Sequence, residues 1–331
     1  MKVAVYDTKP YDQEYLRSAQ VSKAPQLDLT FYEFKLTPQT MHTAKGFEAV
    51  CVFVNDELNR DVVGFLYEHG VKRIVLRCAG YNNVDLESCE KLKIPVFRVP
   101  EYSPHAVAEH AVALLMTLNR KTHKAYNRVR EGNFSLNGLI GFDVYQKVIG
   151  VVGTGKIGRA FAQIMLGFGC RVLGHDLYPD AELATKGVEY VSLEKIIKES
   201  DILSLHVPLT EQTFHLLDRE RLWQLKPGAI IINTGRGALI ETKGLIEVLK
   251  KGHLGGACLD VYEEERRYFF DDFSNRIISD DVLARLLTFP NVVLTSHQGF
   301  FTHEALTAIA ETTITNLLIP TDQINRYGLQ K

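Results

Sequence analysis

The sequence lacks the features that mark several large classes of protein. No apolar run approaches the roughly 18 residues of a membrane-spanning helix. The net charge is only -2, which argues against a nucleic acid or an anionic membrane surface as the main partner. The five cysteines form no C-x-x-C pair, so we expect reduced, mostly buried thiols. Asp7 and Lys9 come too early for the apolar region of a signal peptide, and a cytoplasmic protein is predicted.

What is present is ordinary globular composition, with 46% hydrophobic and 24% charged residues in 331 positions. Short apolar strands alternate with longer amphipathic stretches, which predicts right-handed βαβ crossovers and parallel sheets. The length suits about two domains. The expected strands are residues 2–6, 49–54, 73–76 and 96–99 in a first unit, then 148–152, 171–175, 202–206, 229–233, 257–260 and 292–296 in a second.

A long helical pattern runs from Pro104 to Arg130, and a proline suits the first helical turn. Its first half is apolar on most faces, which predicts burial. His105 and His110 are five positions apart, so on a helix they point in different directions. We therefore predict a packed helix and no metal site.

One glycine motif indicates a nucleotide site. The apolar strand 148–152 runs into Gly153-Thr-Gly-Lys-Ile-Gly158 and then into a helical pattern. Such glycines permit a tight turn, close approach of a pyrophosphate and close packing of helix on strand. Asp176 ends the next strand, where an acid meets the ribose hydroxyls and repels a 2′-phosphate. The motif predicts NAD rather than NADP as cofactor.

Several motifs in order resemble the D-isomer-specific 2-hydroxyacid dehydrogenase family, and most of all its bacterial fermentative, NAD-dependent D-lactate dehydrogenases. They are the glycine motif, Asp176, His206-Val-Pro-Leu-Thr210, Asn233-Thr-Gly-Arg-Gly237, Asp260-Val-Tyr-Glu-Glu-Glu265, His297, and the earlier segments LRCAGYNNVDL and VPEYSPHAVAEHA. The resemblance covers nearly the whole chain.

The resemblance implies two Rossmann-like, doubly wound domains separated by a cleft. The catalytic domain would be residues 1–101 and 299–331, and the NAD-binding domain residues 102–298, through which the family usually dimerises. A homodimer or higher homo-oligomer is therefore expected. The cofactor-binding residues that the resemblance implies are Gly153, Gly155, Lys156, Ile157, Gly158, Asp176, His206, Val207, Pro208, Thr213, Thr234, Gly235, Arg236 and Asp260.

Reduction of a 2-keto acid needs a cation for the substrate and a proton donor that is held charged. Arg236 follows the strand AIIIN and is the predicted cation, since its planar fork can pair with a carboxylate. His297 follows the strand VVLTS and is the predicted proton donor. Three acids stand at 263–265, and the family spacing from Asp260 selects Glu265 as the partner of His297.

For the substrate carboxylate, the resemblance implies the backbone N–H groups of Cys78, Ala79 and Gly80. Arg77 either adds charge there or only pairs within the cleft, and both alternatives stay open. Tyr102 would face the substrate side chain and Phe300 would close the pocket, although either ring could equally belong to the core.

We therefore predict an NAD-dependent D-lactate dehydrogenase that reduces pyruvate. Two alternatives are kept: a relative that acts on larger 2-keto acids, and a non-catalytic NADH-sensing corepressor of the same family. A formate dehydrogenase is disfavoured because that branch carries Gln where Glu265 stands. A phosphoglycerate dehydrogenase often adds a regulatory domain, for which 331 residues leave little room.

Overall fold

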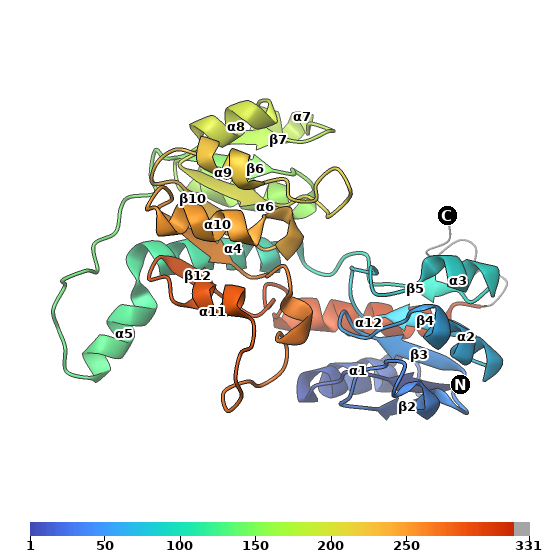
Figure 1. Cartoon of the computed structure of the whole chain (residues 1–331). Coiled ribbons are helices and arrows are strands. Elements are labelled where there is room, and N and C mark those ends of the chain that lie inside the picture. The colour runs from blue at the N-terminus through green and yellow to red at the C-terminus, as the bar shows by residue number, and fades with distance from the viewer. Residues whose placement is uncertain (321–331) are drawn as a thin grey trace. The chain divides into compact units, whose positions relative to one another are not determined.

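The computed structural model describes residues 1–320 of the chain. It folds as two compact units, one made of residues 1–103 with 301–320, the other of Pro104–Phe300. Each unit is built on its own parallel β-sheet, flanked by helices (Figure 1). The predicted fold class, α/β with two parallel sheets, is confirmed.

The sheet of the first unit has five strands in the order β2-β1-β3-β4-β5. Strands β3 and β4 are buried at every residue; β3 is apolar throughout, and in β4 three apolar residues follow Arg73. Arg73 of β4 donates hydrogen bonds to the carbonyls of Leu317 and Ile319, which ties the end of α12 to this sheet. The elements of this unit are β1 (Lys2–Val5), α1 (Pro10–Lys23), β2 (Asp28–Phe31), η1 (Met41–Ala44), β3 (Ala49–Val52), α2 (Arg60–Glu68), β4 (Arg73–Leu76), α3 (Leu86–Lys91), β5 (Val96–Phe97) and α12 (His303–Leu318).

The second unit has seven parallel strands in the order β12-β11-β10-β9-β6-β7-β8. Its elements are α4 (Pro104–Arg120), α5 (Thr122–Arg130), β6 (Val148–Val152), α6 (Lys156–Gly167), β7 (Arg171–His175), α7 (Ala181–Thr185), β8 (Val188–Tyr190), α8 (Leu193–Glu199), β9 (Ile202–Leu205), α9 (Arg219–Gln224), β10 (Ile230–Asn233), η2 (Gly237–Leu239), α10 (Thr242–Lys250), β11 (Gly256–Leu259), η3 (Glu265–Arg267), α11 (Asp281–Leu287) and β12 (Val292–Leu294).

Two hydrophobic cores cover this second sheet. One contains Leu115 of α4 with Phe161 and Met165 of α6. The other contains residues of α8, α9, α10 and α11, among them Ile196 and Val248. Strand order reverses between β6 and β9, because the chain first builds outward through β7 and β8 and then returns. In open α/β sheets this reversal is where ligands bind, beyond the carboxyl ends of the strands.

The single helix predicted over Pro104–Arg130 is wrong. It divides into α4 and α5 because Lys121 adopts a left-handed backbone conformation, with φ of 50°. The Asn119 side chain, at the end of α4, holds the backbone of Phe142 through two hydrogen bonds of 2.8 Å. A distant segment thus contacts the chain where the helix breaks, and a local pattern does not reveal such a contact.

All five cysteines are buried as free thiols. Burial raises the pKa of Cys51 and Cys89 to about 12, so these thiols stay protonated and unreactive. Within residues 1–320, no helix has the length and apolar character that crossing a membrane would need.

Candidate active site

The glycine motif forms the turn between β6 and α6. A Cβ on Gly158 would lie 1.9 Å from the carbonyl oxygen of Gly153, so the helix start packs directly on the turn. Gly153 has φ of +91°, a backbone conformation that would be strained in a residue with a side chain. A Cβ on Gly155, by contrast, would meet nothing within 4 Å. Open space beside the N–H groups at the start of α6 is what a bound pyrophosphate needs.

Asp176 follows β7 and is held beside this turn. One carboxylate oxygen accepts hydrogen bonds from the backbone N–H of Thr154 at 2.6 Å and from the Thr154 hydroxyl at 3.2 Å. The other accepts the N–H of Tyr178 at 2.9 Å. These bonds orient an acid next to the glycine turn, as recognition of a ribose requires. The residues present therefore fit a bound dinucleotide.

The carboxyl end of β9, the strand next to β6, carries His206 and the segment that follows. The imidazole bonds to the Ser204 hydroxyl at 2.9 Å. Removal of this ring from water lowers the pKa of His206 to about 4, so it is neutral near pH 7. Val207 and Pro208 continue the segment, and the Thr213 hydroxyl donates to the Pro208 carbonyl at 2.7 Å.

Arg236 lies in the turn after β10. The buried Asn233 side chain shapes this turn by donating to the Arg236 carbonyl and accepting the N–H of Gly235. The Arg236 guanidinium donates one hydrogen bond, to the Gly235 carbonyl at 2.8 Å, and no other to residues 1–320. Most of its fork is thus available to an anion. The buried hydroxyl of Thr234, in the same turn, also has no partner among these residues.

Asp260 follows β11 and is only 1% exposed. Its carboxylate accepts hydrogen bonds from the N–H groups of Gln298 and Gly299, and its backbone carbonyl accepts the N–H of His297. Burial acts to raise the pKa of Asp260, but the bonds from His110 and Thr295 bring it below its usual value. Asp260 therefore stays ionised and shapes the turn that carries His297.

His297 meets Glu265 across this turn. Its Nδ1 lies 2.7 Å from Oε1 of Glu265, whose Oε2 accepts the N–H of Tyr262 at 3.0 Å. Within residues 1–320, Nε2 of His297 makes no hydrogen bond. The carboxylate thus fixes the ring through one nitrogen and leaves the other to exchange a proton. Of the three adjacent acids, Glu265 is the one that contacts His297.

The predicted substrate residues of the first unit follow β4. Arg77 is only 1% exposed; it donates to Asp12 at 3.1 Å and to the Asp7 carbonyl at 2.6 Å. Arg77 therefore pairs with groups of its own unit. Cys78 is buried, whereas Ala79, Gly80 and Tyr102 are partly exposed. Phe300, the last residue of the second unit, is buried, with 9% of its surface exposed.

Two features of the site have no sequence signal that we recognised. His110 of α4 lies 3.2 Å from Asp260 and 3.1 Å from the Thr295 hydroxyl, although a distant helix supplies it. Glu263 lies 2.7 Å from Nε2 of His215, as a second carboxylate–histidine pair. Both depend on which strand ends become neighbours, and a linear pattern does not state that.

Comparison with known proteins identifies the family. The model of the D-isomer specific 2-hydroxyacid dehydrogenase NAD-binding domain matches residues 112–299. The chain belongs to the D-isomer specific 2-hydroxyacid dehydrogenase family. It is 53% identical to D-lactate dehydrogenase of Escherichia coli, with 96% of each chain covered.

Two solved structures of the family show how closely the folds agree. The pyruvate reductase of Chlamydomonas reinhardtii is 40% identical, with a TM-score of 0.92 and coverage of 100% of this chain and 98% of that one. D-lactate dehydrogenase of Aquifex aeolicus, complexed with NAD and lactic acid, is 31% identical, with a TM-score of 0.83 and coverage of 95% and 94%.

We predict that Asp176→Ala will weaken the preference for NADH over NADPH. The carboxylate is fixed beside the glycine turn, and its charge would repel the extra phosphate of NADPH, so its loss should narrow the preference by roughly 1–3 kcal/mol. The measurement is kcat/KM for both cofactors. Equal use of the two cofactors by the wild-type protein would contradict the assignment.

Proposed function

We propose that this protein is an NAD-dependent D-lactate dehydrogenase, which reduces pyruvate to D-lactate and catalyses the reverse oxidation. The observation that carries the proposal is the 2.7 Å contact between His297 and Glu265, which follow β12 and β11. Arg236 lies in the turn after β10, the next strand of the same sheet. The 53% identity to an enzyme of that name, over 96% of both chains, supports the substrate.

The proposed mechanism assigns one task to each of the three side chains. NADH supplies the hydride when bound. Arg236 holds the substrate carboxylate and polarises the carbonyl that becomes an alkoxide. His297 then donates its proton from Nε2 to that alkoxide, while Glu265 orients the ring through Nδ1. In lactate oxidation the same ring, now neutral, takes the proton back.

We assign the remaining predicted residues by their surroundings. Among residues 1–320, the N–H groups of Ala79 and Gly80 make no hydrogen bond, which suits recognition of a carboxylate. The glycine turn and Asp176 would hold the pyrophosphate and the ribose. The first unit is thus proposed as the substrate domain and the second as the NAD-binding domain. We further propose a cytoplasmic role in fermentation.

We also infer that the protein is a homodimer or a higher homo-oligomer. Helix α5 and the segment after it, up to β6, loop away from the rest of the second unit (Figure 1). This arm exposes large apolar side chains, which monomeric proteins rarely gather in one place. They are Tyr126, Val129, Phe134, Leu136, Ile140, Phe142 and Tyr145, with Ile140 85% exposed.

The solution mass should therefore be at least twice 37.4 kDa. The double variant Leu136→Glu/Ile140→Glu should lower the mass by placing charges in the apolar contact. The matched control is Ile277→Glu, since Ile277 is 91% exposed but lies outside the arm. Light scattering after size-exclusion chromatography measures all three. A monomeric wild type would refute the inference.

Pyruvate should be the best substrate among simple 2-keto acids. The test is kcat/KM with NADH for pyruvate, 2-ketobutyrate and 2-ketoisocaproate. If kcat/KM rises with chain length, the protein belongs with the enzymes of larger substrates. If no acid is reduced although NADH binds, the corepressor-like alternative holds.

We expect Glu265→Gln to lower kcat/KM for pyruvate reduction, because the carboxylate that fixes the His297 ring through Nδ1 is lost. His297→Ala should lower the rate by roughly 10²–10⁴. The exposed Glu264, changed to Gln, is the control and should leave kcat/KM in place. A loss of kcat/KM in Glu264→Gln but not in Glu265→Gln would reject this pair.

A further inference from the structure

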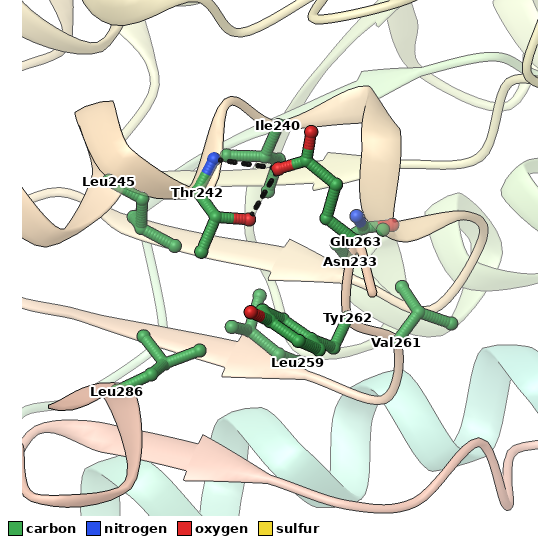
Figure 2. Close-up of a pocket in the computed structure, with 10 residues that line it drawn as sticks. Asn233, Ile240, Thr242, Leu245, Leu259, Val261, Tyr262, Glu263 and Leu286 are labelled. Carbon is green, nitrogen blue, oxygen red and sulfur yellow. Dashed lines mark hydrogen bonds between the residues drawn. The ribbon is translucent and has the colours of Figure 1, made fainter. Parts of the chain in front are cut away.

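Glu263 has contacts that the proposed chemistry does not explain. Its Oε1 lies 2.7 Å from Nε2 of His215, and its Oε2 accepts the Thr242 hydroxyl at 2.8 Å and the Thr242 N–H at 3.3 Å. Figure 2 shows both bonds to Thr242 and the second oxygen turned away from them. The neighbouring Glu264 is exposed and makes no side-chain hydrogen bond within residues 1–320.

Through these contacts Glu263, which follows β11, caps the start of α10. Thr242 is the first residue of α10, and the residue before it, Glu241, supplies no side-chain cap. The unpaired N–H groups of a helix start need an acceptor. Burial acts to raise the pKa of Glu263, but the bonds from His215 and Thr242 bring it below its usual value. The capping group is therefore an anion, which the start of a helix favours.

The other partner, His215, belongs to the segment that follows β9. Its backbone N–H donates to the Ala238 carbonyl at 2.8 Å, so this segment runs beside the turn that carries Arg236. His215 has φ of 47°, an unusual conformation for a residue with a side chain. Such a conformation persists where surrounding contacts hold it, and the bond to Glu263 is one of these contacts.

Glu263 is also packed directly against the Arg236 turn. A Cβ on Gly237 would lie 2.1 Å from the carbonyl carbon of Tyr262 and 2.3 Å from the nitrogen of Glu263. The backbone at Gly237, next to Arg236, therefore packs directly against the backbone of Tyr262 and Glu263, which leads to Glu265. A small movement of one turn must move the other, because no space separates them.

We propose that Glu263, through His215 and Thr242, is a positioning residue that fixes the Arg236 turn relative to the Glu265–His297 pair. An ordinary surface ion pair would contribute little. This pair differs because about three quarters of each side chain is covered, with exposures of 25% and 26%, and because one carboxylate joins three segments. The inference rests on the proposed function, since its effect is read from turnover.

The test compares Glu263→Gln with Glu264→Gln, which makes the same charge change at the next residue. For Glu263→Gln we expect kcat with pyruvate to fall roughly tenfold or more, because small errors in position are costly for catalysis. The Kd for NADH, measured by fluorescence titration, should change less than about threefold. Glu264→Gln should leave both values within about twofold. Rates are expressed per NADH-binding site, so that a smaller folded fraction does not imitate the effect.

The partner variant His215→Asn removes the same contact from the other side. Asparagine tolerates positive φ and is too short to reach Glu263. If the two residues act as a unit, the double variant should be no slower than the slower single variant. Multiplied losses would overturn the pairing.

The outcomes separate this inference from the proposed function. An active wild type with Glu263→Gln equal to Glu264→Gln would overturn the positioning role alone. A wild type that reduces no 2-keto acid would overturn the proposed function, and this role with it. If Glu263→Gln fails to bind NADH, His215→Asn decides: a tenfold loss of kcat supports the role and an unchanged kcat overturns it.

Discussion

The buried carboxylate of Asp260 is the constraint on which the site depends. It accepts the N–H groups of Gln298 and Gly299, and the residue's backbone carbonyl accepts the N–H of His297. His297 has φ of 56°, a conformation that needs such support. A Cβ on Gly299 would lie 3.0 Å from the same carboxylate, so the turn closes tightly around it. The anion thus fixes the turn from which His297 reaches Glu265.

The parallel sheet then brings the other groups to the same edge. Strands β9, β10, β11 and β12 are consecutive neighbours, and a residue of the site follows the end of each within three positions. The residues are His206, Arg236, Asp260 and His297 in that order. Their side chains come from positions up to 91 apart in the sequence, yet the sheet holds them at one edge because parallel strands share a direction.

The sequence predicted the central strands and the glycine turn because these depend on local chemistry. The strand 148–152 is a continuous apolar run and the strand 171–175 has an apolar centre, and the structure has both with the same bounds. The edge strands β2 and β8 were not predicted, since they are short and partly exposed and carry no such run. The break at Lys121 and the role of His110 depend on tertiary contacts, which no local pattern contains.

The segment 263–265 shows most clearly where sequence reasoning ends. Three glutamates in a row have one chemistry and differ only in direction, which the turn after β11 decides. Glu265 turns to His297, Glu264 turns to solvent, and Glu263 turns to His215 and the start of α10. Family spacing selects the first of these but gives no account of the third. At Gly237 the turn that carries Arg236 packs against the backbone of Tyr262 and Glu263 with no space between them. The position of that turn therefore depends on how firmly Glu263 is held. Charge and packing thus act together here: the carboxylates fix the turns, and the glycine lets those turns touch.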